Sequence, residues 1–313
     1  MDGRSVVQYS RFDGRNWSSP IDIYATQPGG AQDRLSAAVG LNGDLHLIWT
    51  QGGGFRTRPI FYSYAQGQEA LSAQHWSKPI RIDVEAHLIS LQVDNEGVIH
   101  IVYTNFYQQP GVFYLRSSDQ GFSWSEPVKL DPDINPGYAP DSMRFELDES
   151  GGLHVVWFYT LIEGGEWDLV QYAHLLDGDD TWSPPITIDQ DDESGRFRGA
   201  VDPVIVTQGQ SIHVLWAAGV QNYRNYRFSS DMGRTWSDSV RVFGELNGQA
   251  GDSLSVDSAG RVHFFGQIRY PQGVYHAYLE SGNWSEPSLI YLIRFNSQDE
   301  IEGRIHAHSV VST

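Results

Sequence analysis

Apolar and polar residues alternate along short segments of this chain, and turn residues separate the segments. The clearest set carries a histidine inside an apolar run: GDLHLIW (43–49), GVIHIVY (97–103), GGLHVVW (151–157), QSIHVLW (210–216) and GRVHFFG (260–266). Alternation with a period of two, bounded by Gly, Asn and Asp, predicts β-strands. No segment shows the periodicity of a convincing amphipathic helix, so the pattern predicts an all-β protein.

A second phrase precedes the last strand of each group. Residues 117–124 and 229–236 share the spacing S-x-D-x-G-x-[ST]-W, and degenerate copies surround Trp17, Trp76, Trp182 and Trp284. Successive Trp residues of this set are 59, 48, 58, 54 and 48 positions apart. Four predicted strands repeated about every 50 residues are the signature of a β-propeller. Six Trp-marked strands therefore predict six blades, each a four-stranded antiparallel sheet.

The two ends of the chain predict how one blade is completed. Residues 4–23 read as the last two strands of a blade, and residues 308–311 align with the start of a first strand. We therefore expect both termini to close one blade, which then lacks its second strand. This gap favours a single propeller domain, residues 1–313, excised from a longer protein whose remaining domains would be its partners.

The repeated phrase has a structural explanation. Asp and Ser side chains can bond backbone N–H groups in a tight turn, and Gly permits a positive φ there. The Trp can then pack on the adjacent blade. A histidine also recurs in register in each second strand, which indicates packing or a shared backbone hydrogen bond rather than catalysis. These histidines are His46, His100, His154, His213 and His263.

Composition narrows the classes of partner. The formal net charge of −18 argues against nucleic acid or an anionic membrane surface as the main partner. The chain has no cysteine, which excludes disulfides, thiol catalysis and Cys-zinc sites. No apolar run approaches the roughly 20 residues that span a bilayer, so we expect no membrane insertion. Composition does not fix the compartment, and we slightly favour an extracellular or cell-surface location.

The spacing S-x-D-x-G-x-[ST]-W followed by a strand resembles the Asp box, or BNR repeat, of the sialidase superfamily. The resemblance covers nearly the whole chain as architecture and implies a propeller whose Asp boxes lie away from the active site. In sialidases of this kind, three Arg hold the substrate carboxylate, a Tyr–Glu pair is the nucleophile and an Asp is the acid/base. The first Arg normally lies in an F/Y-R-I-P phrase. This chain instead has FRTRPI at residues 55–60, which weakens the implied activity.

The main candidate binding site is a ring of polar residues at the starts of the first strands, because propeller ligands usually gather at one mouth of the central channel. Converging carboxylates would repel unless an arginine, a cation, water or a cationic ligand neutralised them. Alternatively, they cap turns through backbone N–H groups. The ring comprises Asp33, His87, Asp141, Asp202, Asp252 and His308. The candidate arginines are Arg34, Arg144, Arg196, Arg198 and Arg304.

The ends of the second strands add aromatic and amide side chains to this rim. Aromatic faces beside amides and carboxylates suit sugars, although the rim of any Trp-rich propeller would look similar. The residues are Trp49, Gln51, Asn105, Phe106, Tyr159 and Gln267.

Two acidic loops place oxygen side chains at alternate positions, an arrangement that could bind Ca²⁺. One loop carries Asp131, Asp133 and Asn135, and the other carries Asp189, Asp191 and Glu193. Neither matches an EF-hand loop, so we favour solvated loops and expect no required cofactor.

The sequence thus predicts a non-catalytic recognition module that binds a glycan or a protein segment at the channel mouth. One alternative is a retaining exo-glycosidase of sialidase type. Its acid/base would be Asp33 or Asp141, and its clamp would be Arg34, Arg144 and Arg304. A second alternative is a structural platform, which would bind a partner chain and no sugar.

Overall fold

The computed structural model describes residues 5–26, 32–52, 58–106, 109–134, 137–161, 169–190, 201–219, 221–248, 251–269 and 272–292. Within these residues the chain is built from β-strands, with one short 3₁₀ turn, η1 (Ala73–His75), so the predicted all-β class is confirmed. The strands form six antiparallel sheets. They belong to two compact units, Met1–Pro140 and Asp141–Thr313, which are described one after the other.

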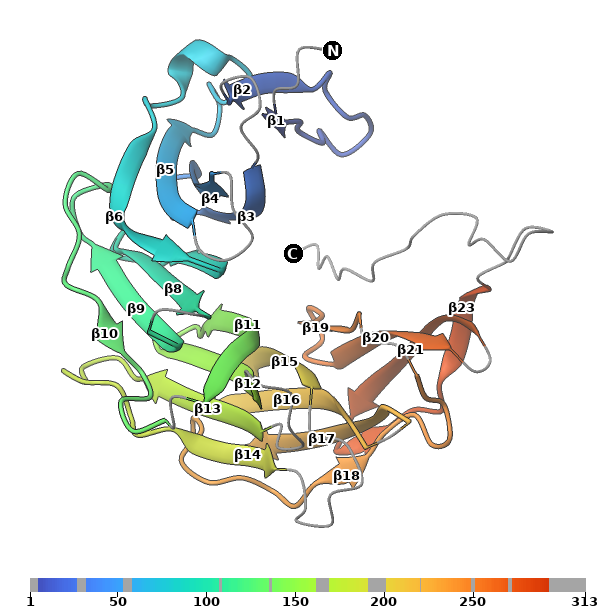
Figure 1. Cartoon of the computed structure of the whole chain (residues 1–313). Helices are drawn as coiled ribbons and strands as arrows, with labels where there is room; N and C mark the ends of the chain where they lie inside the picture. Colours follow the sequence, from blue (N-terminus) through green and yellow to red (C-terminus); the bar gives the residue numbers. More distant parts are fainter. Residues whose placement is uncertain are drawn as a thin grey trace. The chain divides into compact units, whose positions relative to one another are not determined.

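The first unit contains three sheets, in blue to green in Figure 1. The first pairs β1 (Val6–Tyr9) with β2 (Ile21–Ala25). The second has the order β3 (Gln32–Val39), β4 (Asp44–Gln51), β5 (Arg58–Gln66) and β6 (Ile80–Ala86). The third has the order β7 (Leu88–Val93), β8 (Ile99–Asn105), β9 (Gly111–Ser117) and β10 (Val128–Lys129).

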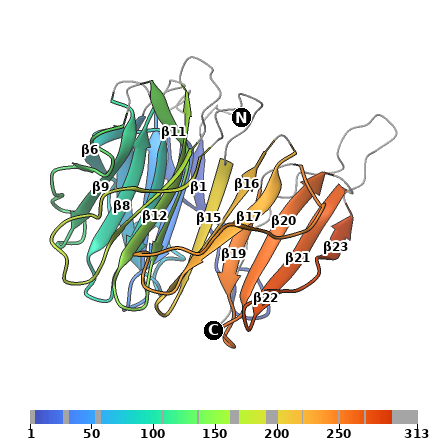
Figure 2. The same ribbon diagram turned by 90° about the horizontal axis from the view of Figure 1, so that it is seen from below.

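The second unit contains three further sheets, and Figure 2 shows their strands side by side. The first consists of β11 (Tyr138–Leu147), β12 (Leu153–Leu161), β13 (Leu169–Leu175) and β14 (Ile186–Gln190). The next consists of β15 (Val201–Gln208), β16 (Ser211–Ala218), β17 (Tyr223–Ser229) and β18 (Val240–Arg241). The last consists of β19 (Ser253–Val256), β20 (Val262–Arg269), β21 (Gln272–Glu280), β22 (Asn283–Trp284) and β23 (Ser288–Leu292).

The second strand of each four-stranded sheet is its most buried element. Six of the seven residues of β8 are buried, and so are six of the eight residues of β16. A strand that other elements cover on both faces reads as a continuous apolar run. The core therefore lies between neighbouring sheets, as where Ile48 and Tyr62 pack with Leu91 and Ile101.

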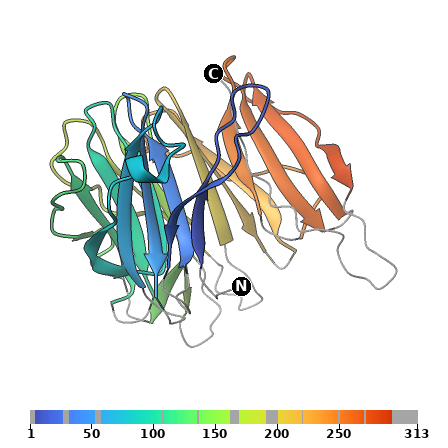
Figure 3. The same ribbon diagram turned by 90° about the horizontal axis from the view of Figure 1, so that it is seen from above.

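The two-stranded β1–β2 sheet packs against β4. Figure 3 shows this dark-blue pair beside the lighter blue strands of the same unit. Val7 is buried with Leu47 and Trp49, and the ring of Tyr24 lies 5.1 Å from that of Trp49. Two strands were predicted for residues 4–23, and two are found. The segment 308–311, expected to add a strand, lies outside the described residues.

The phrase at residues 117–124 folds into a self-bonded turn, called here the Ser-Asp-Gly turn. The Ser117 hydroxyl accepts a hydrogen bond from the Gly121 N–H at 2.9 Å. The Asp119 carboxylate accepts from the Ser123 N–H at 2.8 Å and from the Ser123 hydroxyl at 2.6 Å. The Trp124 indole N–H donates to the Gly121 carbonyl at 3.1 Å. The second copy, residues 229–236, repeats these bonds.

Each Ser-Asp-Gly turn joins its sheet to the preceding one. The ring of Trp124 meets that of Tyr62 edge-on, 5.7 Å between centroids, and a Cβ on Gly121 would overlap the same tyrosine. In the second copy, Gly233 lies against Tyr172 in the same way. The predicted structural role of the phrase is therefore confirmed. The degenerate copy at Trp17 is an exception, since that side chain is 70 % exposed.

The recurrent histidines form buried side-chain pairs. Their Nδ1 atoms lie 2.6–2.8 Å from tyrosine hydroxyls on the adjacent strand in four pairs: His46–Tyr62, His100–Tyr114, His154–Tyr172 and His213–Tyr226. In three sheets Nε2 contacts a carboxylate at 3.0–3.1 Å: His100–Asp94, His154–Asp148 and His263–Asp257. The shared hydrogen bond predicted from the repetition exists, but it joins side chains rather than backbone.

Candidate functional site

A fully buried ion pair lies at the start of β19. Arg224, on β17, donates from Nε and Nη2 to the two carboxylate oxygens of Asp252 at 2.6 and 3.0 Å. Its Nη1 donates to the carbonyls of Asn222 and Gly248, and Nη2 also donates to that of Gln267. These five bonds use all five guanidinium N–H donors. Arg224 therefore ties β17, β20 and the 244–248 loop together and has no donor left for a ligand.

Asp202, at the start of β15, interacts electrostatically with both members of this pair. It is half-buried and adopts a φ of 48°, a left-handed conformation uncommon outside glycine. Burial raises the pKa of Asp202; Asp141 raises it further, whereas Arg144 and Arg224 oppose the shift. A carboxyl with a raised pKa and a strained backbone is a feature often found at functional sites.

Arg144 and Glu146 lie on the same face of β11, because side chains two positions apart in a strand point the same way. Arg144 is exposed, and its Nη1 donates to the Met143 carbonyl at 2.9 Å. Burial raises the pKa of Glu146 to about 7, with Arg144 opposing. The candidate site is therefore defined by electrostatic influence: Asp141 and Arg144 act on Asp202, Arg144 acts on Glu146, and the Arg224–Asp252 pair acts on Asp202 or is acted on by it.

The structure brings together part of the predicted ring. Asp141 is the fourth residue of β11, Asp202 is the second residue of β15, and Asp252 immediately precedes β19. Arg144 acts electrostatically on both Asp202 and Asp252. Turn capping, one of the two interpretations, is wrong for Asp252, whose carboxylate binds Arg224. Sequence reasoning missed Arg224 because it lies 28 residues from Asp252, on a different strand position from the candidate arginines.

The other ring members lie elsewhere. His87 is half-buried in the first unit, with its ring 5.6 Å from that of Phe106. The backbone of Asp33 belongs to β3, where Arg34 is exposed, and the side chain of Asp33 is not described. The remaining candidates lie outside the described residues: Arg196, Arg198, Arg304 and His308.

Two of the predicted rim aromatics are core residues instead. Trp49 is 1 % exposed and stacks on Phe61 at 5.9 Å, and Tyr159 is 0 % exposed beside Trp157. Neither presents a face to a ligand, so this expectation is corrected. The reason is that the buried stretches of β4 and β12 extend as far as Thr50 and Tyr159, so both aromatic side chains lie inside them. Asn105 is half-buried at the end of β8.

The acidic loops do not assemble a cation site from their described members. Asp131 is 4 % exposed, and burial raises its pKa to about 7. Asp189 accepts a hydrogen bond from the Trp216 indole at 2.6 Å, whereas Asp133 is exposed. Asn135, Asp191 and Glu193 lie outside the described residues. In the part of the chain that the structure describes, no group of three acidic or histidine side chains could hold a metal ion.

No protein-family model matches this sequence, and no curated protein matches it. Solved structures do. The BP39L lectin from Burkholderia pseudomallei is similar over 92 % of this chain and 78 % of the lectin, with 17 % identity and a TM-score of 0.64. The Hadza microbial sialidase Hz136 matches over 83 % of this chain with 14 % identity and a TM-score of 0.54. This chain spans 58 % of that sialidase.

A third similar structure is an alpha-L-arabinanase from Penicillium chrysogenum, complexed with arabinobiose. It covers 86 % of both chains, with 12 % identity and a TM-score of 0.52. At these identities the likeness shows the fold alone. The chain has the fold of a β-propeller, with six sheets of antiparallel strands in its described residues, as the sequence predicted. None of those residues forms a helix of the length and apolar character that a bilayer crossing requires.

Proposed function

We propose that the protein is a non-catalytic glycan-recognition module that binds at the Asp141–Arg144–Asp202 cluster. The observation that carries this proposal is that one group of charged side chains is buried and paired, whereas a neighbouring group is exposed. Arg224 and Asp252 satisfy each other in the interior, whereas Arg144 and Asp141 stay exposed beside the half-buried Asp202. The buried pair holds the strand ends, and the exposed side chains are available to a ligand.

The chemistry of this cluster suits sugar hydroxyls. A hydroxyl both donates and accepts, so it can bridge a carboxylate and a guanidinium in one contact. The comparisons support the proposal because a lectin, a sialidase and an arabinanase share this fold. The formal net charge of −18 disfavours a strongly anionic polymer as ligand.

A glycan-array screen followed by calorimetric titration tests the proposal. The Arg144→Ala variant is expected to bind the selected glycan at least about tenfold more weakly, since a charged hydrogen bond contributes roughly 1.5–3 kcal/mol. The matched control is Arg234→Ala, another exposed arginine of the second unit. Equal affinity of the two variants, or a blank array with folded protein, would contradict the proposal.

A retaining glycosidase is the second candidate, and the raised pKa values favour it. A carboxyl that keeps its proton near neutral pH can act as a general acid. Asp202 and Glu146 both have raised pKa values beside Arg144. Hydrolysis of an aryl sialoside that is lost in both Asp202→Asn and Arg144→Ala would establish the enzyme and overturn the non-catalytic proposal.

A further inference from the structure

The last described sheet lacks the Ser-Asp-Gly turn. In the sheet before it, Ser237 pairs with Phe228, and the turn between them comprises residues 229–236. In the last sheet, Ser285 pairs with Tyr278, and the turn comprises only residues 279–284. This turn is two residues shorter. Trp284 folds straight back onto Leu279 through two residues with positive φ, which is the geometry of a tight hairpin.

The shorter turn places no glycine against its neighbouring tyrosine, unlike the two Ser-Asp-Gly turns. Trp284 still meets Tyr226 edge-on at 5.2 Å, as Trp236 meets Tyr172 at 4.9 Å. A Cβ on Gly233 would overlap Tyr172, but a Cβ on Gly282 would meet nothing within 4 Å. At this sheet pair no glycine of the turn packs against the tyrosine, and Tyr226 is nevertheless only 3 % exposed.

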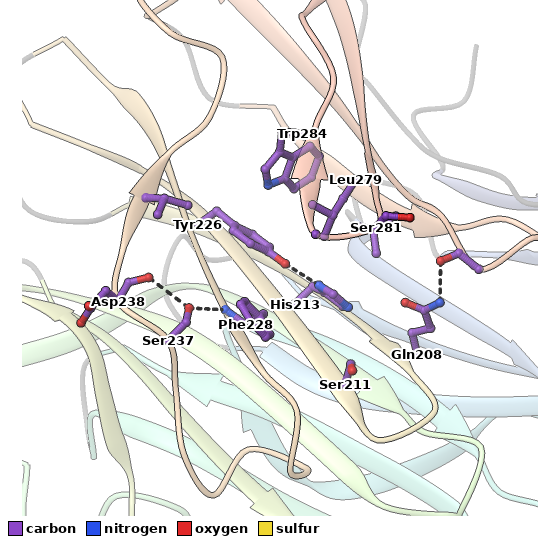
Figure 4. Close-up of a pocket in the computed structure, with 14 residues that line it drawn as sticks. Gln208, Ser211, His213, Tyr226, Phe228, Ser237, Asp238, Leu279, Ser281 and Trp284 are labelled. Atoms are coloured by element: carbon purple, nitrogen blue, oxygen red, sulfur yellow. Dashed lines mark hydrogen bonds between the residues drawn. The ribbon is translucent and has the colours of Figure 1, made fainter.

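A cavity of about 550 Å³ lies at this place, between the β15–β18 and β19–β23 sheets (Figure 4). Its volume is within the range of small-molecule sites. One wall is an aromatic cluster of His213, Tyr226 and Phe228, in which every pair of ring centroids lies 6.0–6.5 Å apart. Trp284 and Leu279 line another side. The cavity thus combines flat apolar faces with polar side chains.

Two buried polar atoms of the cavity lining have no hydrogen-bond partner among the described residues. They are the indole Nε1 of Trp284 and the Nε2 of His213, which is 5 % exposed. In the two Ser-Asp-Gly turns the corresponding indole donates to the glycine carbonyl. Both atoms are covered by protein, so a ligand pairs with them only after the lining side chains shift, and that pairing relieves the cost of an unpartnered buried group.

The unpaired histidine follows from a shortened hairpin. In the β7–β8 hairpin, Gln92 pairs with His100, and Asp94, two residues later, binds its Nε2. In the β15–β16 hairpin, Val206 pairs with His213, and Gln208 occupies the corresponding position. Gln208 donates to the Gly260 carbonyl at 2.5 Å instead. The carboxylate that holds Nε2 in three other sheets is therefore replaced here.

We propose that this cavity binds the acetamido group of a neutral N-acetylated sugar. At two other sheet pairs, a glycine peptide unit sits on the tyrosine ring and accepts the Trp N–H. An acetamido group offers the same carbonyl and N–H on a small apolar body, so its oxygen can accept from Trp284. The pyranose C–H face packs on Phe228, the exposed ring of the aromatic cluster. Asp238 at the cavity disfavours an anionic sugar.

This site is separate from the cluster in the proposed function. Asp202 and Gln208 lie at opposite ends of β15, about 20 Å apart at roughly 3.3 Å per residue. Val240 and Phe228 are the exposed large apolar residues of the cavity lining, at 49 % and 42 % exposure. A bulky residue at position 240 can therefore block entry without disturbing the buried groups.

The test is a titration of ¹⁵N-labelled protein with N-acetylglucosamine, with glucose as the matched sugar that lacks the acetamido group. The Trp284 indole cross-peak, assigned with Trp284→Phe, is expected to shift with N-acetylglucosamine and not with glucose. Val240→Trp should weaken this binding at least tenfold. Val128→Trp is the control, because Val128 is the equivalent residue of β10 and is 48 % exposed.

Arg144→Ala should leave the shift unchanged, which separates this site from the one in the proposed function. The inference is overturned by any of three results with folded protein: no shift of the Trp284 peak at saturating sugar, an equal shift with glucose, or an undiminished shift in Val240→Trp.

Discussion

The contribution of the Gly233–Tyr172 contact to the free energy of unfolding can be measured by comparing alanine variants of Gly233 and Gly282. The two glycines have nearly the same backbone, with φ of 86° and 81°, but only Gly233 touches a neighbouring ring. Alanine at a left-handed position costs roughly 1–2 kcal/mol at either site. At position 233 the added methyl also overpacks against Tyr172, which costs roughly another 1–3 kcal/mol. Gly233→Ala should therefore lose about 2–5 kcal/mol and Gly282→Ala about 1–2 kcal/mol.

Equilibrium urea unfolding, followed by far-UV circular dichroism and tryptophan fluorescence, gives both losses. Gly121→Ala provides an internal replicate, since Gly121 has a φ of 84° and contacts Tyr62 in the first unit. It should behave like Gly233→Ala. Equal destabilisation by Gly233→Ala and Gly282→Ala would refute the reasoning, because the turn would then contribute backbone geometry and no packing between sheets.

Three further predictions concern buried charge and pH. Asp252→Asn leaves Arg224 buried without a counter-ion and should cost about 3–5 kcal/mol in urea unfolding, whereas Arg241→Ala, which breaks an exposed pair with Glu245, should cost about 0–1 kcal/mol. Burial lowers the pKa of His213 to about 4 from 6.5, so its contribution to stability is present above pH 6.5 and is lost as pH falls towards 4. The free energy of unfolding should fall by about 3 kcal/mol over that interval. His213→Phe should flatten the plot of unfolding free energy against pH there, and an unchanged slope in this variant would contradict the prediction. Burial raises the pKa of Glu146 to about 7, so the stability that its protonated form contributes is present below pH 4.5 and is lost as pH rises through 7. Glu146→Gln should therefore raise the melting temperature at pH 8 but not at pH 4.

Local sequence signals predicted the sheets well. The histidine-bearing apolar runs became β4, β8, β12, β16 and β20, and the Ser-Asp-Gly phrases became self-bonded turns. Both depend on residues close together in the chain. The Arg224–Asp252 pair could not be predicted, because it depends on how two neighbouring sheets are placed.

The two rim aromatics were predicted wrongly because their exposure also depends on how neighbouring sheets pack. Trp49 and Tyr159 stand at strand ends in the sequence, and only the packing of neighbouring elements shows that they are covered. The degenerate copy around Trp284 was visible from the sequence. Its structural consequence depends on Tyr226, a residue 58 positions away against which the shortened turn packs no glycine.

The strictly sequential order of strands in the four-stranded sheets has an evolutionary consequence. A contiguous stretch of about 50 residues encodes one whole sheet, so gene duplication copies a complete unit. Each Ser-Asp-Gly turn packs its Trp on the sheet before it, so a deletion in one copy can leave the other copies intact. Redundancy among the repeats thus allows a single copy to diverge, and the turn at 279–284 is a copy that differs from the two Ser-Asp-Gly turns. In such a protein, a new binding specificity can arise when residues are deleted from one repeat, without any new element being inserted into the fold.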